Sequence, residues 1–310
     1  MPTTFPSTRL TATSPPNPLF PAKKSILKKK KRPTEEERFA IGQAKRLLKR
    51  GKRSQKWEIR YQLVLSAVRS TIAILQNFGL SCAAFGSLAC KLYGEFRFPE
   101  DVNLLVLQPP QQGYPNSSIL SHTVEEIKKL IIDADPVHYY FKTPGDLFYR
   151  EEGYRTDCRV DIVLPGTMHL PSLLPPEPSG GATTANADTS DGAASATGRQ
   201  IITISGIPII PFYLLLLHKL QAWSDRYSSN ELSKRRKSSQ DKVDVKRLLN
   251  MWEHIEPLRL TQPWTNKVLF SEEFQELTKE RVRKYCSAFR KKAVCETWKS
   301  LGFEVDNFRI

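Results

Sequence analysis

The chain has 310 residues, of which 40% are hydrophobic and 10% aromatic, and it carries a formal net charge of +15. That apolar fraction can build a sizeable core, which excludes a chain that is disordered throughout, and the length allows one large domain or two small ones. The positive charge favours polyanionic partners such as RNA, DNA or nucleotide phosphates, unless most of it belongs to one basic tail.

The cysteines and the apolar runs predict the compartment. The five cysteines have no CxxC spacing and are odd in number, which favours reduced thiols inside a cell, in the nucleus or the cytoplasm. The longest apolar run, around residues 207–217, is too short to span a membrane and is broken by prolines. No membrane partner is therefore expected.

The N-terminal part is predicted to be a tail followed by two helices. Residues 1–34 are rich in Pro, Ser and Thr and contain the basic run 23–33, so we expect a disordered basic tail. That run fits a nuclear localisation signal or a tether for nucleic acid phosphates, and equally a solvated tail without a partner. Acidic residues from Glu35 predict a helix up to residue 53, and apolar residues three and four apart predict a second helix over residues 57–78.

Residues 83–106 carry the motif around which the rest of the chain is interpreted. They are typical of a strand, a tight Gly-Ser turn, a short helix, a loop and a second strand. Gly86 and Ser87 stand at the turn, where backbone N–H groups can approach a phosphate. Asp101 begins the second strand, and because side chains alternate along a strand, Asn103 shares its face. Two oxygen-bearing side chains so placed can converge on a hard cation such as Mg²⁺.

Further along, the sequence predicts one helix, several strands and an insertion. Ser121 is expected to cap a helix over residues 122–133. Asp161 alternates with apolar neighbours, as on a strand. The predicted strands cover residues 138–142, 147–150, 158–164 and 201–205. Residues 171–199 are of low complexity and are predicted to be a disordered surface insertion.

The C-terminal third is predicted to be helical. Residues 212–223 are apolar all round and should form a buried helix, in which His218 is expected to be a hydrogen-bonded core residue. The polar and basic residues 226–240 are expected to form a loop or an exposed helix end. The remaining predicted helices cover residues 241–252 and 271–289.

These motifs resemble the nucleotidyltransferase superfamily related to DNA polymerase beta. That superfamily has Gly-Ser at a strand-to-helix turn, then Asp-x-Asp or Asp-x-Glu on the next strand, and a third carboxylate on a later strand. The matching residues here are Gly86, Ser87, Asp101, Asn103 and Asp161. The second aspartate of the superfamily is replaced by Asn103 in this chain.

A closer likeness is to the abortive-infection toxin-like nucleotidyltransferases and to uncharacterised fungal proteins of similar layout. It is carried by Gly94, Arg97, Pro99 and Asp101, and by Lys219, Asp241 and Asp244 in the C-terminal helices. The resemblance implies an α+β fold with a mixed sheet flanked by helices and a C-terminal helical part. The implied domains are a nucleotidyltransferase-like domain over residues 35–210 and a helical region over residues 211–310, after the tail.

The resemblance also implies a site. Asp101 and Asp161 would be catalytic, and Asp101, Asn103 and Asp161 would hold Mg²⁺ or Mn²⁺. The residues expected to bind a nucleoside triphosphate are Gly86, Ser87, Lys91, Arg97 and Lys219. Lys91 is alternatively a solvated helix residue, and Lys219 alternatively reaches the surface. Asp244 is expected to pair with Arg226 or Arg247 rather than to bind metal.

Two functions stay open at this point. The first is a metal-dependent nucleotidyltransferase that transfers a nucleotidyl group to RNA, a protein or a small molecule. The second is a catalytically inactive nucleotide- or RNA-binding protein on the same fold, because the neutral amide of Asn103 adds no negative charge to a metal site. A purely structural basic protein is a third reading, and the sequence leaves the acceptor, the base and the oligomeric state open.

Overall fold

The computed structural model describes residues 35–108, 122–171, 173–174, 200–289 and 291–305. The chain divides into two compact units, Met1–Arg50 and Gly51–Ile310, and of the first unit residues 35–50 are described. Helix α1 (Glu35–Asn77) begins in the first unit and ends in the second. The predicted tail, the predicted cap Ser121 and most of the predicted insertion lie outside the described residues. The second unit holds the sheet and the candidate site.

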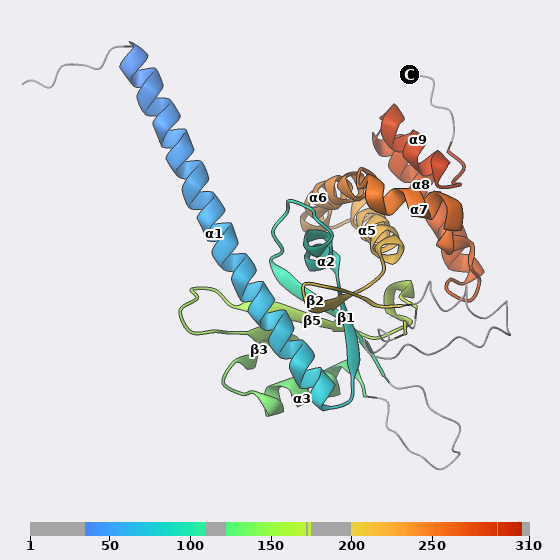
Figure 1. Cartoon of the computed structure of the whole chain (residues 1–310), viewed down its shortest axis with the longest axis horizontal. Coiled ribbons are helices and arrows are strands. Elements are labelled where there is room, and N and C mark those ends of the chain that lie inside the picture. Colours follow the sequence, from blue (N-terminus) through green and yellow to red (C-terminus); the bar gives the residue numbers. More distant parts are fainter. Residues whose placement is uncertain (1–34, 109–121, 172, 175–199, 290, 306–310) are drawn as a thin grey trace, which may run out of the picture. The chain divides into compact units, whose positions relative to one another are not determined.

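Seven strands of the described chain form one mixed sheet in the order β3-β4-β5-β2-β1-β7-β6 (Figure 1). The strands are β1 (Ser81–Phe85), β2 (Asp101–Leu107), β3 (Tyr139–Thr143), β4 (Asp146–Tyr149), β5 (Cys158–Val163), β6 (Ile202–Ile204) and β7 (Ile207–Ile209). Strand β2 lies antiparallel to β1 and parallel to β5, and β7 lies parallel to β1. Strand β2 lies inside the sheet with a neighbour on each side; its residues 104–107 are all buried, and its polar side chains stand only at its start.

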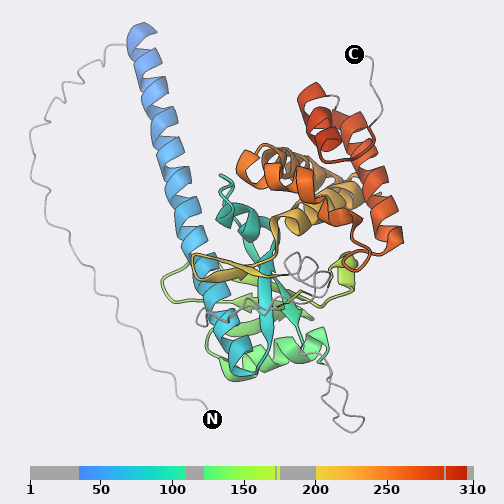
Figure 2. The ribbon, with the colours of Figure 1, turned by 45° about the vertical axis from the view of Figure 1, so that its right-hand side comes forward.

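Helices flank this sheet and make up the C-terminal part. Besides α1 they are α2 (Gly86–Leu92), α3 (Val124–Ala134), α5 (Phe212–Tyr227), α6 (Leu232–Leu249), α7 (Trp252–Thr261), α8 (Glu272–Phe289) and α9 (Lys292–Ser300), with short 3₁₀ turns at Thr167–His169 and Pro263–Thr265. Helices α5 to α9 form one group beside α2, and α3 lies on the opposite side of β1 and β2 (Figures 1 and 2). The predicted α+β class is confirmed. None of the described helices has both the length and the apolar character that a membrane crossing requires.

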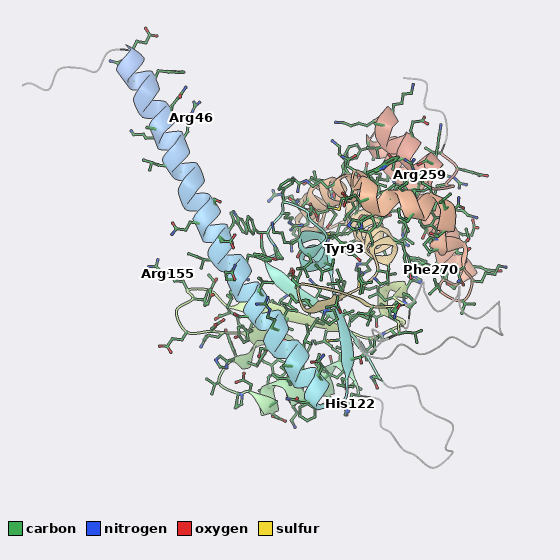
Figure 3. All side chains as sticks on the ribbon, in the orientation of Figure 1. Arg46, Tyr93, His122, Arg155, Arg259 and Phe270 are labelled. Atoms are coloured by element: carbon green, nitrogen blue, oxygen red, sulfur yellow. The ribbon has the colours of Figure 1, made fainter. Side chains whose placement is uncertain are left out.

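Helix α5 connects the C-terminal helices to the sheet. It is buried along most of its length because it is apolar on nearly every face, as predicted. The ring of Trp223 meets Tyr285 of α8 edge-on, with 4.9 Å between centroids. Tyr93, labelled in Figure 3, donates its hydroxyl to the Ile210 carbonyl at 2.8 Å and packs edge-on against His254 of α7. These contacts keep α5 and α7 against the end of α2.

The two helices predicted over residues 35–53 and 57–78 are a single helix, α1. Residues 54–56 between them include neither Gly nor Pro, so nothing in that segment interrupts the backbone hydrogen bonds of a helix. Gly51 lies inside α1, where a glycine costs roughly 1 kcal/mol relative to alanine without ending the helix. The apolar spacing revealed only the part that packs on the core, from Leu63 to Leu75.

Of the two alternatives expected for residues 226–240, the exposed helix end is confirmed for most of the segment, but the start of the helix predicted over residues 241–252 was placed too late. Helix α6 begins at Leu232, well before the predicted start at residue 241. Its first turns are exposed and rich in Lys, Arg and Gln, which are good helix formers, so they need no apolar stripe. Helices α7 and α9 and strand β7 were not predicted; α7 contains Pro257 and β7 contains Pro208, and proline ordinarily signals a break.

Helix α3 has a different cap from the predicted one. Thr123 is its N-cap: the Thr123 hydroxyl accepts a hydrogen bond from the Glu126 backbone N–H at 3.3 Å. The Glu126 carboxylate in turn accepts from the Thr123 backbone N–H at 2.7 Å. This reciprocal capping box satisfies two of the free N–H groups at the start of the helix and holds α3 next to β3 and β5.

Candidate active site

The side chains of Asp101, Asn103 and Asp161 share one face of the sheet. Strands β2 and β5 pair in a parallel register that sets Asn103 opposite Asp161 and Asp101 opposite Arg159. Residues that lie two apart on a strand, or directly opposite on the next one, point to the same side. All three side chains are half-buried. Two carboxylates from separate strands therefore border one space.

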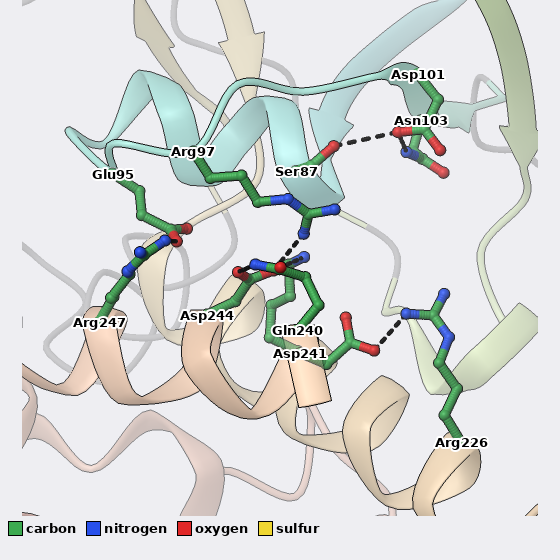
Figure 4. Close-up of polar contacts among 11 residues, drawn as sticks. Ser87, Glu95, Arg97, Asp101, Asn103, Arg226, Gln240, Asp241, Asp244 and Arg247 are labelled. Carbon is green, nitrogen blue, oxygen red and sulfur yellow. Dashed lines mark hydrogen bonds and ion pairs between the residues drawn. The ribbon is translucent and has the colours of Figure 1, made fainter. Parts of the chain in front are cut away.

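Both carboxylates have polar neighbours. Ser87 donates its hydroxyl to Asp101 Oδ1 at 3.1 Å, and Asn103 Nδ2 donates to the same oxygen over a long 3.4 Å (Figure 4). On β5, Arg159 forms an ion pair with Asp161. Burial raises the pKa of Asp161, and the Arg159 guanidinium opposes that rise. The acidic side chains are thus oriented by neighbouring side chains and are not left to solvent alone.

Gly86 makes the turn from β1 into α2 possible. Its φ is +71°, in the left-handed region that other residues rarely adopt. A Cβ at this position would lie 3.1 Å from Asn103 Nδ2, closer than ordinary contact. The glycine therefore allows Ser87 to approach Asp101 and leaves room for the Asn103 amide.

We expect Gly86→Ala to lower the free energy of unfolding by more than the roughly 1–2 kcal/mol that a left-handed backbone costs a residue with a Cβ. The excess reflects displacement of Asn103. Gly153→Ala is the matched control, because its φ is +87° and no atom lies within 4 Å of the added Cβ. Urea unfolding of both variants measures the difference. Equal losses would contradict a close contact between residue 86 and Asn103.

The three side chains open into a pocket of about 600 Å³, which we call the carboxylate pocket. This volume lies in the roughly 300–1,000 Å³ range of small-ligand sites. Its walls come from the turn between β1 and α2, from β2 and β5, and from helices α5 and α6. Its carboxylates belong to Glu100, Asp101, Asp161 and Asp241, and its cations to Arg97, Arg159, Lys219, Arg226 and Lys237. The pocket therefore combines acidic groups with a surplus of basic ones.

A buried carboxylate holds the helical wall of this pocket together. Asp244 of α6 is fully buried and pairs with Arg97 at 2.7 Å and with Lys219 of α5 at 3.0 Å (Figure 4). Gln240 donates to the second Asp244 oxygen at 3.0 Å. Burial alone would raise the pKa of Asp244, but Lys219 and Arg97 more than offset it and hold that pKa below its usual value. One carboxylate thus joins α6, α5 and the loop before β2.

The prediction that Asp244 pairs with Arg226 or Arg247 was wrong. Arg226 pairs with Asp241 instead, and Arg247 pairs with Glu95 at 2.9 Å (Figure 4). Asp241 and Asp244 are one helical turn apart, so both face the same neighbouring elements. Sequence spacing cannot assign the partners of two such neighbours, because the partners come from other elements.

Most of the residues predicted to form the site meet in the carboxylate pocket. Those that line it are Gly86, Ser87, Arg97, Asp101, Asn103, Asp161 and Lys219. Lys91 does not line it: its ammonium lies 4.5 Å from the centre of the Phe98 ring and 5.7 Å from that of Tyr61. Lys219 does not reach the surface, because its side chain is 7% exposed and is paired with Asp244. The chemical roles of all these residues stay predictions.

His218 also lines the pocket, and it is buried, as predicted. Its ring meets Phe85 edge-on with 5.1 Å between centroids. Burial lowers the pKa of His218 to about 4, so the imidazole is neutral near pH 7. The expected hydrogen bond is not found at Nε2, which has no partner among the described residues.

Three basic residues of the pocket were not predicted as part of the site. Arg159 lies two residues before Asp161 on the same strand face, a spacing that could have identified it. Arg226 and Lys237 belong to residues 226–240, which were expected to be a loop or an exposed helix end, so no helical spacing was used to orient them. Lys237 is exposed and forms no ion pair with the described residues.

The donors of the pocket suit one hard cation. Asp101, Asn103 and Asp161 provide two carboxylates and one amide oxygen, and Mg²⁺ in proteins is commonly held by one or two carboxylates together with water and substrate phosphates. Within the described ranges, no group of three or more His, Cys, Asp or Glu side chains is placed to hold a metal ion. The residues therefore fit a single Mg²⁺ or Mn²⁺, and they offer few carboxylates for a second one.

Comparison with known proteins gives a distant likeness to a solved structure. No protein-family model matches the sequence, and no curated protein matches it. Among solved structures, the chain is similar to one titled an antigenic nucleotidyltransferase-like protein from Paracoccidioides brasiliensis. The two chains are 11% identical with a TM-score of 0.45, and the match covers 79% of this chain and 95% of the other. Similarity this distant does not establish an activity, so the case for function depends on the carboxylate pocket itself.

Proposed function

We propose that the carboxylate pocket transfers a nucleotidyl group from a nucleoside triphosphate to a hydroxyl acceptor on RNA, a protein or a small molecule, with the help of Mg²⁺ or Mn²⁺. The observation that carries the proposal is the parallel register of β2 and β5, which brings Asp101, Asn103 and Asp161 to one face. In this reaction the acceptor hydroxyl attacks the α-phosphorus in line: a new P–O ester bond forms, the bond to the β-phosphate breaks, pyrophosphate leaves, and the hydroxyl proton passes to solvent. The protein mainly supplies positioning and charge.

The acidic residues would hold the cation. Asp101, Asn103 and Asp161 are its proposed ligands, and when bound it neutralises phosphate charge and favours ionisation of the attacking hydroxyl. Ser87 orients the Asp101 carboxylate through its 3.1 Å hydrogen bond. Arg159 balances the charge of Asp161 until substrate arrives.

The basic residues divide into two roles. Arg97 and Lys219 share the single Asp244 carboxylate, which holds both in place and leaves one net positive charge among the three, so they mainly shape the wall of the pocket. Lys237 is exposed and forms no ion pair with a described residue, which suits it to contact a triphosphate. Arg226 keeps part of its guanidinium exposed beside Asp241 and can add to the same attraction.

The test is transfer of label from α-³²P ribonucleoside triphosphates to bulk RNA or to protein, with Mg²⁺ or Mn²⁺. We expect covalent label to appear in one acceptor fraction and to vanish when the divalent ion is chelated. Label that persists in the chelator, or no label in any fraction with either ion, would contradict the proposal.

A second candidate function is binding of a nucleotide or RNA without turnover. It is favoured by Asn103, which adds no charge and whose Nδ2 is directed at the Asp101 carboxylate. If the site is a weakened one, Asn103→Asp restores a third carboxylate and should raise the transfer rate or the Mg²⁺ affinity about ten-fold or more. Asn250→Asp, at the exposed C-terminal end of α6, is the matched control and should change neither.

The two candidates give different results with this variant. Transfer by the wild-type chain that rises in Asn103→Asp supports an enzyme with a reduced charge. Transfer that appears only in Asn103→Asp supports a binding protein derived from an enzyme. A rate and a Mg²⁺ affinity that stay unchanged in Asn103→Asp would contradict any contact of residue 103 with the cation.

A further inference from the structure

A second pocket, of about 410 Å³, adjoins the carboxylate pocket. Three of its lining side chains are aromatic: Trp57 of α1, and Phe96 and Phe98 of the loop before β2. We call it the aromatic pocket. Its polar lining residues are Arg97, Glu100, Gln240 and Arg247. The whole lining lies within the second compact unit.

One of the three rings, that of Phe96, is open to solvent, and a second, that of Trp57, is half-buried. Phe96 is 86% exposed, and within the described part of the chain neither Phe96 nor Trp57 stacks on another ring. Phe98, by contrast, is held by Tyr61 edge-on at 5.8 Å and by the Lys91 ammonium. A single exposed apolar side chain is ordinary, but an exposed ring and a half-buried ring that line one pocket, neither stacked on another ring, favour a planar apolar ligand.

The charges in this pocket argue against a phosphate as its occupant. Both cations of the pocket already have a carboxylate partner: Arg97 pairs with Asp244, which it shares with Lys219, and Arg247 pairs with Glu95. The Glu100 side chain is exposed and forms no ion pair with a described residue. A free carboxylate repels phosphate and accepts hydrogen bonds from amino groups such as those on the edges of nucleobases.

The aromatic pocket is continuous with the proposed reaction site. Arg97, Glu100 and Gln240 line both pockets. Glu100 stands directly before β2, which begins at Asp101. The loop before β2 therefore borders two connected compartments, and the rings of Phe96 and Phe98 line only one of them.

We propose that the aromatic pocket binds a nucleobase, stacked on Phe96 and Trp57, while the phosphates of the same nucleotide lie in the carboxylate pocket. The placement of the phosphates rests on the proposed function. Stacking on aromatic side chains is tolerant of the base, because every base has a π-face. The base belongs either to the nucleoside triphosphate or to the acceptor strand. Binding measurements with triphosphates and with an oligonucleotide distinguish these two sources.

The test compares ligands with and without bases on the full chain. The probes are the four ribonucleoside triphosphates against inorganic tripolyphosphate, and a single-stranded hexaribonucleotide against its abasic counterpart, all with Mg²⁺. Calorimetry measures the dissociation constants for the wild type, Phe96→Ala and Trp57→Ala. Phe78→Ala is the matched control, because Phe78 is also exposed, at 51%, and lines neither pocket.

Phe96→Ala and Trp57→Ala should each weaken binding of the base-containing probe about ten-fold, as loss of a stacking partner does. Binding of the matched baseless probe and all binding by Phe78→Ala should stay unchanged. A loss confined to the triphosphates assigns the base to the donor, and a loss confined to the oligonucleotide assigns it to the acceptor.

Equal affinities of the variants and the wild type would overturn this proposal, as would a wild type that binds none of the base-containing probes. The result of this binding test can be distinguished from the result of the label-transfer test of the proposed function. Base-dependent binding lost in Phe96→Ala supports the pocket even when no label is transferred. Label transfer with unchanged binding in both variants supports the reaction and overturns the pocket.

Discussion

Replacing Asp244 with asparagine should lower the free energy of unfolding by about 3–5 kcal/mol, the usual cost of removing one partner from a buried ion pair. Asp244 is fully buried, and it compensates Lys219, which is 7% exposed, together with Arg97. In the variant, the Lys219 ammonium stays in the protein interior opposite a neutral amide. Chemical denaturation at pH 7 measures the loss.

The control is a pair on the surface. Glu231 and Lys234 form an exposed ion pair in the first turn of α6, so Glu231→Gln should cost roughly 1 kcal/mol or less. The double variant Lys219→Met with Asp244→Leu removes the two buried charges and leaves Arg97, which is partly exposed and can be solvated, so it should recover part of the loss. A loss in Asp244→Asn no larger than that in Glu231→Gln would contradict the account of the buried carboxylate.

The same carboxylate predicts a dependence of stability on pH. The folded-state pKa of Asp244 lies below its ordinary value of about 3.9, so its stabilising effect is complete above that unfolded-state value. It is lost as the pH falls through the lower folded-state pKa. The difference in unfolding free energy between the wild type and Asp244→Asn should therefore shrink below about pH 4.

Asp101→Ala should lower the rate of nucleotidyl transfer at least about 100-fold, the usual cost of losing one group that stabilises charge in a transition state. Asp101 is proposed to hold the cation, and it also accepts the Ser87 hydroxyl, so its removal affects both the ion and the order of the turn. The rate is measured by label transfer under saturating Mg²⁺.

Two further variants show whether the loss of transfer rate in Asp101→Ala is specific to this position and whether it is due to the negative charge. Asp133→Ala removes an exposed aspartate of α3 that lines neither pocket, and it should transfer label at the wild-type rate. Asp101→Asn keeps the shape and the hydrogen-bond acceptor for Ser87 but removes the charge. If Asp101→Asn is as active as the wild type, the negative charge has no role, and a metal-dependent reaction at this pocket is contradicted.

The sheet and its polar face could be predicted from local sequence. The strand pattern around Asp161 and the Gly-Ser turn before α2 both depend on residues close in the chain, so alternation and turn chemistry suffice to find them. The register pairs the apolar residues of β2 with those of β5 on the same face of the sheet, and this pairing sets Asn103 opposite Asp161. The residues predicted on β2 and β5 accordingly share one pocket.

The helical wall could not be predicted in the same way. The partners of Asp244 come from α5 and from the loop before β2, which are far from it in sequence, and spacing on α6 does not identify them. Lys91 was expected either to bind phosphate or to be a solvated helix residue, and its ammonium instead lies over the rings of Phe98 and Tyr61. The partner of a charged side chain in these two cases depends on tertiary contacts, for which a single sequence gives no signal.

The most direct test of the central claim is calorimetric titration of the wild-type chain with ATP and the other ribonucleoside triphosphates, with Mg²⁺ and then with the ion chelated. The account predicts saturable binding that requires Mg²⁺ and is lost in the variants Asp101→Ala and Asp161→Ala. Triphosphate binding of equal strength without the ion, or retained when both carboxylates are removed, would show that these side chains do not form a shared cation site.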